Sequence, residues 1–385
     1  MVDTARALDF ATQLFELVER TRTNSTYKYA LLLALIDCCQ ESFQKDGSGP
    51  QMLTTRQVAE KVLELYWHQA RQHPELGEVK QNQGAQARIV SVIGEFQRTH
   101  AKSTSVFAAR LGYPSDYARL LSKIEWRLIE EPLPRLQSVG DAEHDILYQV
   151  HWTASDVRKQ KRASGVSAYQ KRYQNDPQAD LWVSTDGFDN RIMLNDDVGD
   201  MLVRLAPLFR PLVRREWTRL VARLNDVETD ELERFLFASF RQNLTQLCEP
   251  LRDVQEGRCF YCEGRMSGDA EVDHFVAWSR CPNDDLYNLV LAHPTCNNAK
   301  SDHLAALPHL RRWVRRFDSS TSISQRISDV ARDIEWQSEP DRSLAVSRSI
   351  YLPLPPGTPL WLEKRDAFER ANPREIQDVL QQVEV

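Results

Sequence analysis

The sequence predicts a mainly α-helical protein with a small α+β part. Apolar side chains recur at helical spacing over residues 8–18 and 58–66, which indicates amphipathic helices. The segment from Tyr27 to Cys39 is apolar nearly all round, as expected for a helix buried at the centre of a domain. Short apolar segments also predict a small sheet, and they lie at residues 146–152, 181–183 and 192–194.

Capping residues and breakers indicate where the N-terminal helices begin and end. Asn24 and Ser25 can cap the start of the buried helix, because their side-chain oxygens accept from free amides. The sequence GSGP at 47–50 interrupts the helical pattern. Thr54 followed by Gln57 has the spacing of a capping box, which predicts that the next helix begins there.

The later part of the chain alternates between helical and strand-like patterns. A further helix is expected over 85–96, and the pattern is helical again over 201–254, with Thr229 as a candidate cap. Asp186-Gly187 is a turn signal between two of the predicted strands. The two patterns together predict a mixed strand and helix region that follows the helical N-terminal part.

Length and apolar runs exclude several classes of protein. The chain has 385 residues, which predicts two or three domains. Its longest apolar run, at 29–36, is far shorter than the roughly 20 residues of a membrane span. The first ten residues contain two acidic side chains and no apolar core, so they are not a signal peptide. We therefore expect a cytoplasmic protein that does not interact with a membrane.

The distribution of charge is compatible with a nucleic-acid partner. The formal net charge is −6, which is not the charge of a protein that coats nucleic acid. Two basic runs could nevertheless contact phosphates, one at 158–172 and the other, RRWVRR, at 311–316. For either run taken alone, a solvated surface is the alternative interpretation.

Three of the seven cysteines belong to one spaced cluster. An odd number of cysteines in a long chain without a signal peptide argues against a disulfide framework. Cys259-x-x-Cys262 and His293-x-x-Cys296 are two short-spaced pairs, which is the arrangement that tetrahedral zinc requires. A lone CxxC could be a chance pair or a redox motif, but two pairs around one segment favour structural Zn²⁺. Two later histidines remain alternatives for the second pair: His303 and His309.

The segment between the two pairs carries a polar motif. In VDHF, apolar residues flank Asp273 and His274, as at the end of a short strand, and Asn288 and Asn297 follow. Together with the cysteine pairs, this pattern over 259–303 resembles the HNH endonuclease family, also called the ββα-metal or His-Me finger nucleases. The chain departs from the family in having HxxC where many zinc-bearing members have CxxC, and asparagine where some have the final histidine. Imidazole binds zinc and amide oxygen binds hard cations, so neither departure removes a function.

The resemblance implies a ββα-metal fold and a role for each polar residue. His274 would act as the general base, because an unperturbed imidazole titrates near neutrality and can accept a proton from water. Asp273 and Asn297 would bind a catalytic Mg²⁺ or Mn²⁺, and Asn288 would orient the ring of His274 or its loop. Lys300 lies one helical turn after Asn297 and could meet a phosphate oxygen.

The finger segment itself is acidic. Residues 259–303 contain three basic and seven acidic side chains, so the segment cannot hold DNA by charge alone. Its last helix is expected over 295–306, and basic residues beyond that helix must supply the phosphate contacts. The first candidates follow directly, and residues 158–172 are the second: Arg311, Arg312, Arg315 and Arg316.

The sequence thus predicts four parts with different roles. These are a helical N-terminal domain (1–140), a mixed strand and helix connecting region (141–250), the HNH nuclease domain with structural zinc (251–310) and a C-terminal extension (311–385). The Pro-rich end of the extension is expected to pack as extended chain. The N-terminal domain would provide target choice, assembly or regulation.

The function predicted from the resemblance is metal-dependent hydrolysis of DNA, double-stranded by expectation. A homodimer would suit double-strand cutting with one active site per chain, and analogy with stand-alone architectures points to a partner in restriction or anti-phage defence. One alternative is a non-catalytic zinc module that binds nucleic acid or protein. Another is an HNH nuclease that acts on RNA, because the same chemistry serves both substrates.

Overall fold

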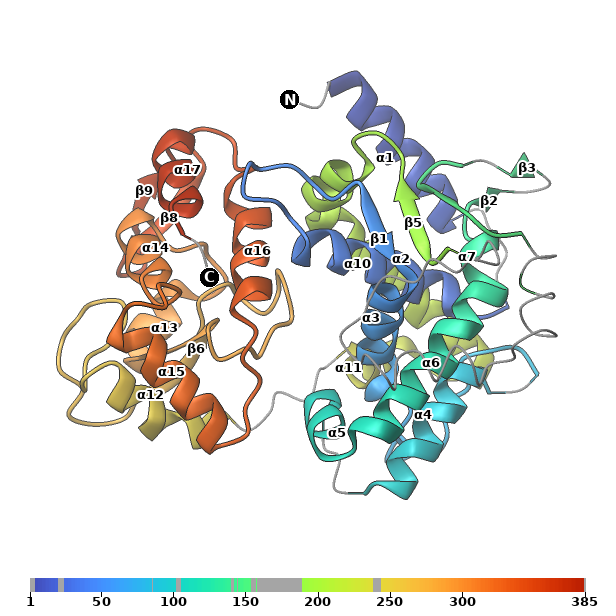
Figure 1. Cartoon of the computed structure of the whole chain (residues 1–385), viewed down its shortest axis with the longest axis horizontal. Coiled ribbons are helices and arrows are strands. Elements are labelled where there is room, and N and C mark those ends of the chain that lie inside the picture. The colour runs from blue at the N-terminus through green and yellow to red at the C-terminus, as the bar shows by residue number, and fades with distance from the viewer. Residues whose placement is uncertain are drawn as a thin grey trace. The chain divides into compact units, whose positions relative to one another are not determined.

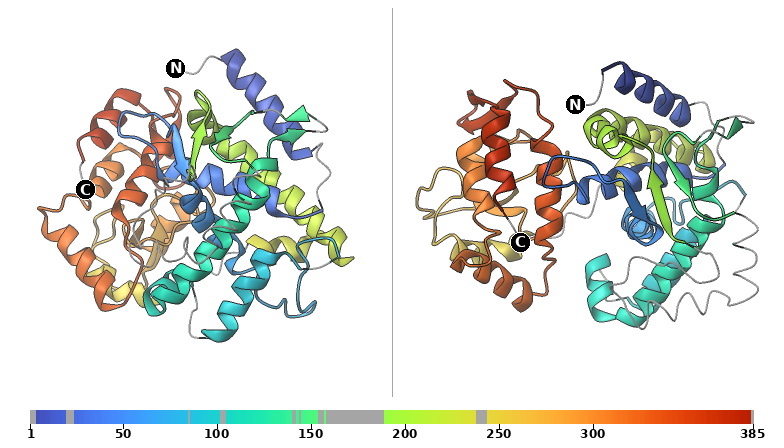
Figure 2. Two further views of the ribbon diagram at one scale, coloured as in Figure 1. Left: turned by 45° about the vertical axis from the view of Figure 1, so that its right-hand side comes forward. Right: turned by 45° about the horizontal axis from the view of Figure 1, so that its top comes forward.

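The computed structural model divides the chain into two compact units (Figures 1 and 2). Unit 1 comprises Met1–Cys39 and Gly49–Ser239, and unit 2 comprises Gln40–Ser48 and Phe240–Val385. Helices predominate in both, which confirms the mainly α class with a small β part. The structure describes residues 4–19, 24–84, 86–101, 105–139, 142–143, 145–153, 157, 189–237 and 244–383. The four-part division of the sequence remains a prediction.

Unit 1 is built mainly from helices, and the three earliest helices expected from the sequence are present. Its helices are α1 (Thr4–Glu19), α2 (Tyr27–Glu41), α3 (Thr55–Trp67), α4 (Arg88–Thr99), α5 (Val106–Gly112), α6 (Pro114–Glu130), α7 (Pro132–Arg135), α10 (Val198–Asn225) and α11 (Thr229–Phe237). The capping box at the start of α3 is confirmed, because the Thr54 hydroxyl accepts from the Gln57 amide and the Gln57 side chain accepts from the Thr54 amide. Helix α4, Arg88–Thr99, corresponds to the helix expected at about 85–96.

A small antiparallel sheet lies beside these helices. Its strand order is β1-β5-β4, formed by β1 (Met52–Thr54), β5 (Arg191–Leu194) and β4 (Tyr148–Val150). A separate two-stranded pair joins β2 (Ser138–Val139) to β3 (Ala142–Glu143). The strands expected near 148 and 192 are therefore confirmed. The strand expected at 181–183, the turn at 186–187 and the basic run at 158–172 lie outside the described residues.

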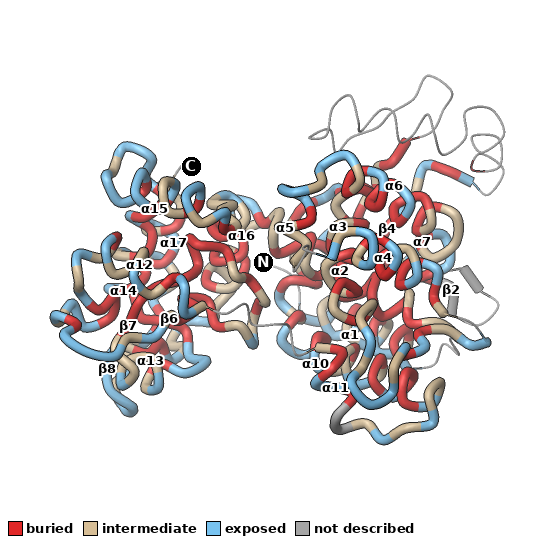
Figure 3. The backbone as a smooth tube through the Cα atoms, turned by 90° about the horizontal axis from the view of Figure 1, so that it is seen from below, coloured by how far each residue is buried: buried red, intermediate tan, exposed pale blue. Residues whose placement is uncertain are grey.

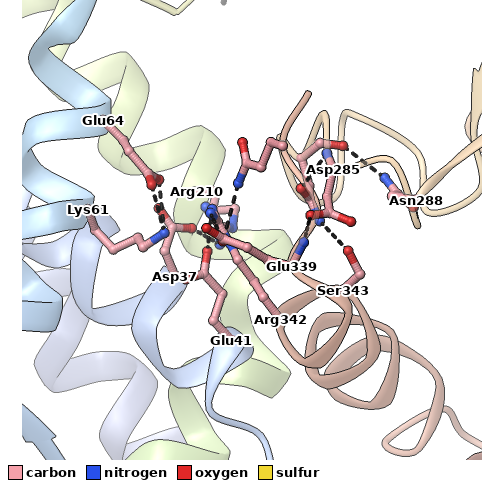
Figure 4. Close-up of polar contacts among 12 residues, drawn as sticks. Asp37, Glu41, Lys61, Glu64, Arg210, Asp285, Asn288, Glu339, Arg342 and Ser343 are labelled. Atoms are coloured by element: carbon pink, nitrogen blue, oxygen red, sulfur yellow. Dashed lines mark hydrogen bonds and ion pairs between the residues drawn. The ribbon is translucent and has the colours of Figure 1, made fainter. Parts of the chain in front are cut away.

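Polar side chains pair with one another in and around the core of unit 1. The buried Tyr66 ring packs edge-on against Trp217 at a centroid distance of 5.2 Å, and its hydroxyl lies 2.7 Å from the hydroxyl of Thr26. Two ion pairs lie nearby in the same unit and are drawn in Figure 4: Lys61 with Glu64, and Arg210 with Asp37. Figure 3 marks the buried backbone in red and shows that it runs through the helices of both units.

Unit 2 contains two short strands followed by a helix. β6 (Glu271–His274) pairs antiparallel with β7 (Leu289–Ala292), so that His274 lies opposite Leu289, and α13 (Pro294–Lys300) follows. This is a ββα arrangement. Helix α13 ends well before residue 306, contrary to the prediction, because the backbone turns at Ser301 with a φ of 50°.

Helices after the finger complete unit 2 and share its core. Phe275 stacks on Trp313 of α14 (Leu307–Val314) at a centroid distance of 4.8 Å, and Tyr261 contacts Trp361 of β8 (Pro359–Glu363) edge-on at 5.1 Å. The part of the extension expected to be extended chain includes the strand β8, which pairs with β9. The remaining elements of unit 2 are η1 (Leu244–Leu247), α12 (Cys248–Val254), α14 (Leu307–Val314), α15 (Ser322–Asp333), α16 (Pro340–Tyr351), β8 (Pro359–Glu363), β9 (Ala367–Arg370) and α17 (Pro373–Gln381). Within the described part of the chain, the structure contains no helix with the length and apolarity needed to cross a membrane.

Two glycines allow the chain to approach itself closely in unit 1. A Cβ atom on Gly199, in the first turn of α10, would lie 2.3 Å from the carbonyl oxygen of Pro50. A Cβ atom on Gly49 would lie 2.4 Å from the carbonyl carbon of Gly199. Both contacts are with backbone atoms, which cannot move aside as the end of a flexible side chain can. Glycine is therefore required here for close packing.

We predict that Gly199→Ala destabilises the protein, although alanine is the better helix former by about 1 kcal/mol. Steric overlap of this kind costs on the order of 1–3 kcal/mol, which outweighs the gain in helix propensity. Gly112→Ala in α5 is the matched control, because a Cβ there would meet nothing within 4 Å. Thermal melting should place Gly199→Ala below the wild type and Gly112→Ala at or above it. Equal melting temperatures for the two variants would contradict the packing argument.

Candidate functional site

Four side chains of unit 2 converge in a metal-binding arrangement. The ligand atoms of Cys259, Cys262, His293 and Cys296 all lie within 4.8 Å of one another. Bonds of about 2.0–2.3 Å to a tetrahedral zinc ion space its ligands by roughly 3.7 Å. Three thiols and one imidazole thus fit a structural zinc ion, with one pair from the loop before β6 and the other from the start of α13.

The electrostatics of the cysteines also favour a cation. Burial and the neighbouring cysteines Cys259 and Cys262 raise the pKa of Cys296 to about 12. Burial likewise opposes ionisation of Cys262, but hydrogen bonds from the Gly264 backbone and from the other cluster residues lower its pKa overall. Thiolates crowded in this way ionise together only when a cation lies between them.

The imidazole of His293 is oriented as a metal-binding ring. Its Nδ1 lies 3.3 Å from Sγ of Cys262, and its Nε2 lies 3.3 Å from the carbonyl oxygen of Arg265. A carbonyl at Nε2 fixes the proton on that nitrogen and leaves the Nδ1 lone pair for the metal. The other two candidates lie elsewhere, with Nε2 of His309 2.7 Å from the Leu362 carbonyl oxygen and the ring of His303 against Phe368.

His274 lies at the last position of β6, as the motif predicted. Its Nε2 is 2.8 Å from Oδ1 of Asp284, and its ring contacts Trp278 edge-on at 5.1 Å. The sequence analysis did not find Asp284 as a partner. The residue lies ten positions away in an irregular loop, and its spacing has no motif that could have indicated the contact.

Asp273 faces the opposite side of β6 and has two buried partners. Its Oδ2 accepts from the Tyr261 hydroxyl at 2.5 Å and lies 3.0 Å from Nζ of Lys300. Lys300 is fully buried and also donates to the carbonyl oxygen of His274 at 2.9 Å. The ammonium therefore points into the unit, and a phosphate contact through it would require this ion pair to open. Both of these partners contact Oδ2 of the carboxylate.

Asn297 lies on the surface of α13, beside the same face of β6. Its Nδ2 donates to Oε2 of Glu271 at 2.8 Å. Glu271 precedes Asp273 by two positions in the strand, so both carboxylates are on one face. The described structure thus places Asp273 and Asn297 on facing elements but gives their side chains different partners. Glu271 is a second residue that the sequence analysis missed.

Asn288 holds the loop that follows His274. Its Oδ1 accepts from the Val276 amide at 2.9 Å, and its Nδ2 donates to the carbonyl oxygens of Val276 and Asn283. Asp285 lies in the same network, as Figure 4 shows together with Asn288 and Ser343. Burial raises the pKa of Asp285 to about 6, although its hydrogen bonds act in the opposite direction. This network fixes both ends of the loop that carries Asp284.

The four arginines at the end of α14 do not form one surface row. Arg311 is exposed and lies 3.3 Å from Glu375, whereas Arg312 binds the loop of the zinc cluster through the carbonyl oxygens of Phe260 and Tyr261. Arg315 is exposed. Arg316 is buried and donates to the Leu286 carbonyl at 2.9 Å, because it follows the end of the helix and turns into the core.

Comparisons with known proteins match an N-terminal and a C-terminal part of the chain separately. A family model described as a domain of unknown function (DUF8808) matches residues 5–238, which is more than half of the chain. The chain belongs to this family. A second model, described as HNH endonuclease, matches residues 259–303, so the resemblance found in the sequence is confirmed. No curated protein and no solved structure matched the chain.

We predict that the purified protein carries one tightly bound zinc ion in its HNH domain. Structural zinc contributes on the order of 10 kcal/mol to folding at small sites, so Cys259→Ser should unfold the finger locally. Zinc content by atomic emission and protection by hydrogen exchange are the measurements. Cys281→Ser is the control, because this cysteine is buried in the same core but is not one of the four cluster residues. Unchanged zinc content and protection in Cys259→Ser would refute this assignment.

Proposed function

We propose that this protein is a divalent-cation-dependent endonuclease that hydrolyses phosphodiester bonds of DNA. The observation that carries the proposal is the end of β6, where His274 is paired with Asp284 inside a ββα unit matched by the HNH endonuclease model. A histidine oriented by a carboxylate is the arrangement used for general base catalysis.

His274 would accept the proton of the attacking water. When Nε2 donates its proton to Asp284, the other ring nitrogen carries the lone pair that acts as the base. The carboxylate of Asp284 then stabilises the imidazolium that forms, as it lies 2.8 Å from the ring. Asn288 would keep this geometry by fixing the loop on both sides of Asp284.

The proposed donors for a catalytic cation are Asp273 and Asn297, and because β6 ends at His274, the cation and the imidazole would meet one phosphate beyond the end of the strand. Oδ1 of Asp273 and the amide oxygen of Asn297 are hard ligands of the kind that Mg²⁺ and Mn²⁺ take, and the carboxylate of Glu271 lies beside Asn297. The bound cation would neutralise charge that develops on the phosphoryl oxygens.

Tyr261 and Lys300 would act as positioning residues for Asp273. Both hold Oδ2 and thereby fix the direction in which Oδ1 points. Partners that orient a ligand carboxylate in this way are worth about 10–100-fold in metal affinity or activity.

Double-stranded DNA is the proposed substrate, and RNA is the alternative that the same groups would cleave. We propose further that the N-terminal part selects the target or a partner, with restriction or anti-phage defence and the cytoplasm as the setting. A homodimer would bring two active sites to the two strands.

The proposal predicts that His274→Ala removes cleavage while zinc content and DNA binding stay near those of the wild type. The loss of a general base typically lowers the rate by roughly 10²–10⁴-fold. The measurement is single-turnover cleavage of plasmid DNA, with a structured RNA as the second substrate. Cleavage by His274→Ala at the wild-type rate would contradict the mechanism and favour a non-catalytic zinc module.

Two further variants separate a missing base from a missing cation ligand. Asp273→Ala and Asn297→Ala should recover part of their activity at high Mn²⁺, because they weaken cation binding. His274→Ala should recover only when a small base such as imidazole replaces the side chain. A Mn²⁺ titration that restores all three variants equally would remove the distinction between the two roles.

A further inference from the structure

A pocket of about 280 Å³ opens in unit 2 on the side of the zinc loop that carries Phe260. It lies between the end of α12, the loop from residue 255 to 263, the end of α14 and the start of α15. Its charged lining consists of four arginines and two glutamates: Arg258, Arg312, Arg315, Arg316, Glu256 and Glu263. The pocket is therefore a local concentration of positive charge beside an acidic finger segment.

The two glutamates have cationic partners of their own. Glu263 lies 2.6 Å from Arg312, and Glu256 lies 3.3 Å from Arg326, which is not among the residues that line the pocket. The other three lining arginines therefore have no carboxylate partner among the residues that line the pocket: Arg258, Arg315 and Arg316. Arg258 donates to the backbone carbonyl of Glu263, at 3.0 Å.

Arg316 is the lining residue whose guanidinium has buried donors without an acceptor. Its side chain is only 4% exposed, and Nη2 donates to the Leu286 carbonyl. Its Nε and Nη1 are buried and have no hydrogen-bond partner among the described residues. The nearby Asp285 binds the backbone amides of Tyr287 and Glu339 with its two oxygens. A buried donor without an acceptor is destabilising, so an anion beside Arg316 would be stabilising.

We propose that this arginine pocket binds a phosphate group. Planar guanidinium groups present paired donors that match phosphate oxygens, and several arginines around one concavity favour a doubly charged or bridging anion. Phe260 lines the pocket, and the next residue, Tyr261, holds Asp273. The zinc loop therefore connects the pocket directly to the proposed catalytic carboxylate.

The phosphate could come from two sources that share this chemistry. One is the backbone of a bound nucleic acid, and this version rests on the proposed function. The other is a free nucleotide, which does not depend on that function. The two sources are distinguished by which probe, DNA duplex or free nucleotide, is bound more weakly when an arginine of the pocket is substituted.

The test compares Arg315→Gln with Arg311→Gln in the full-length, zinc-bound protein. Both residues are exposed and belong to the same arginine run, but Arg311 is paired with Glu375 and does not line the pocket. Binding of a labelled DNA duplex is followed by fluorescence anisotropy over a NaCl series, and binding of adenosine monophosphate by calorimetry. No Mg²⁺ or Mn²⁺ is added. Arg316→Gln is the second variant, checked for folding by zinc content.

A DNA phosphate in the pocket predicts that Arg315→Gln lowers duplex affinity by roughly 5–10-fold and reduces the log–log salt slope by about one. Arg311→Gln should change affinity less than 2-fold. A bound nucleotide predicts the same loss for adenosine monophosphate with duplex binding unchanged. The proposal would be overturned if Arg315→Gln and Arg316→Gln both bind the duplex and adenosine monophosphate as tightly as the wild type does. It would also be overturned if Arg311→Gln loses as much affinity as Arg315→Gln.

The same measurements separate this proposal from the proposed nuclease function. Because no catalytic cation is present, binding reports on the pocket even when the protein cleaves nothing. Loss of duplex binding in Arg315→Gln together with an inactive wild type would retain the pocket and reject the nuclease. If the wild type cleaves DNA but substitution of the pocket arginines does not change binding, the nuclease function would be retained and the phosphate pocket rejected.

Discussion

The convergence of three thiols and one imidazole on a single point is the constraint on which unit 2 depends. The pair Cys259 and Cys262 precedes β6, and the pair His293 and Cys296 begins α13, so closing the cluster joins the loop before β6 to the junction of β7 and α13. Without a cation the thiolates would repel one another, whereas a bound zinc ion turns the same charges into bonds. The finger is too short to bury much apolar surface alone, and it shares its core with the helices that follow.

The loop between the first two cysteines connects three parts of this unit. Its carbonyl groups accept from Arg312, which anchors the loop to α14. Phe260 turns to the arginine pocket, and the Tyr261 hydroxyl holds Asp273. A change in this loop would therefore alter both the proposed phosphate site and the proposed cation site. The arrangement would let a structural metal affect the proposed chemistry without taking part in it.

Sequence analysis succeeded where short spacing determines the structure. The two ligand pairs, the end of the strand at His274 and the capping box at Thr54 each depend on neighbours within a few residues. It missed Asp284 and Glu271, whose contacts depend on how a loop and a helix return to β6. It also placed Arg316 on the surface, because a basic run does not reveal which of its members turns inward after a helix ends.

The central claim is that the ββα unit hydrolyses DNA with a divalent cation. The most direct measurement is incubation of the zinc-retaining wild-type protein with supercoiled plasmid, with and without Mg²⁺ or Mn²⁺, followed by separation of the products on a gel. The account predicts nicked or linear DNA only when one of these cations is present. Intact plasmid under every cation condition, from folded protein with stoichiometric zinc that binds the plasmid, would contradict it.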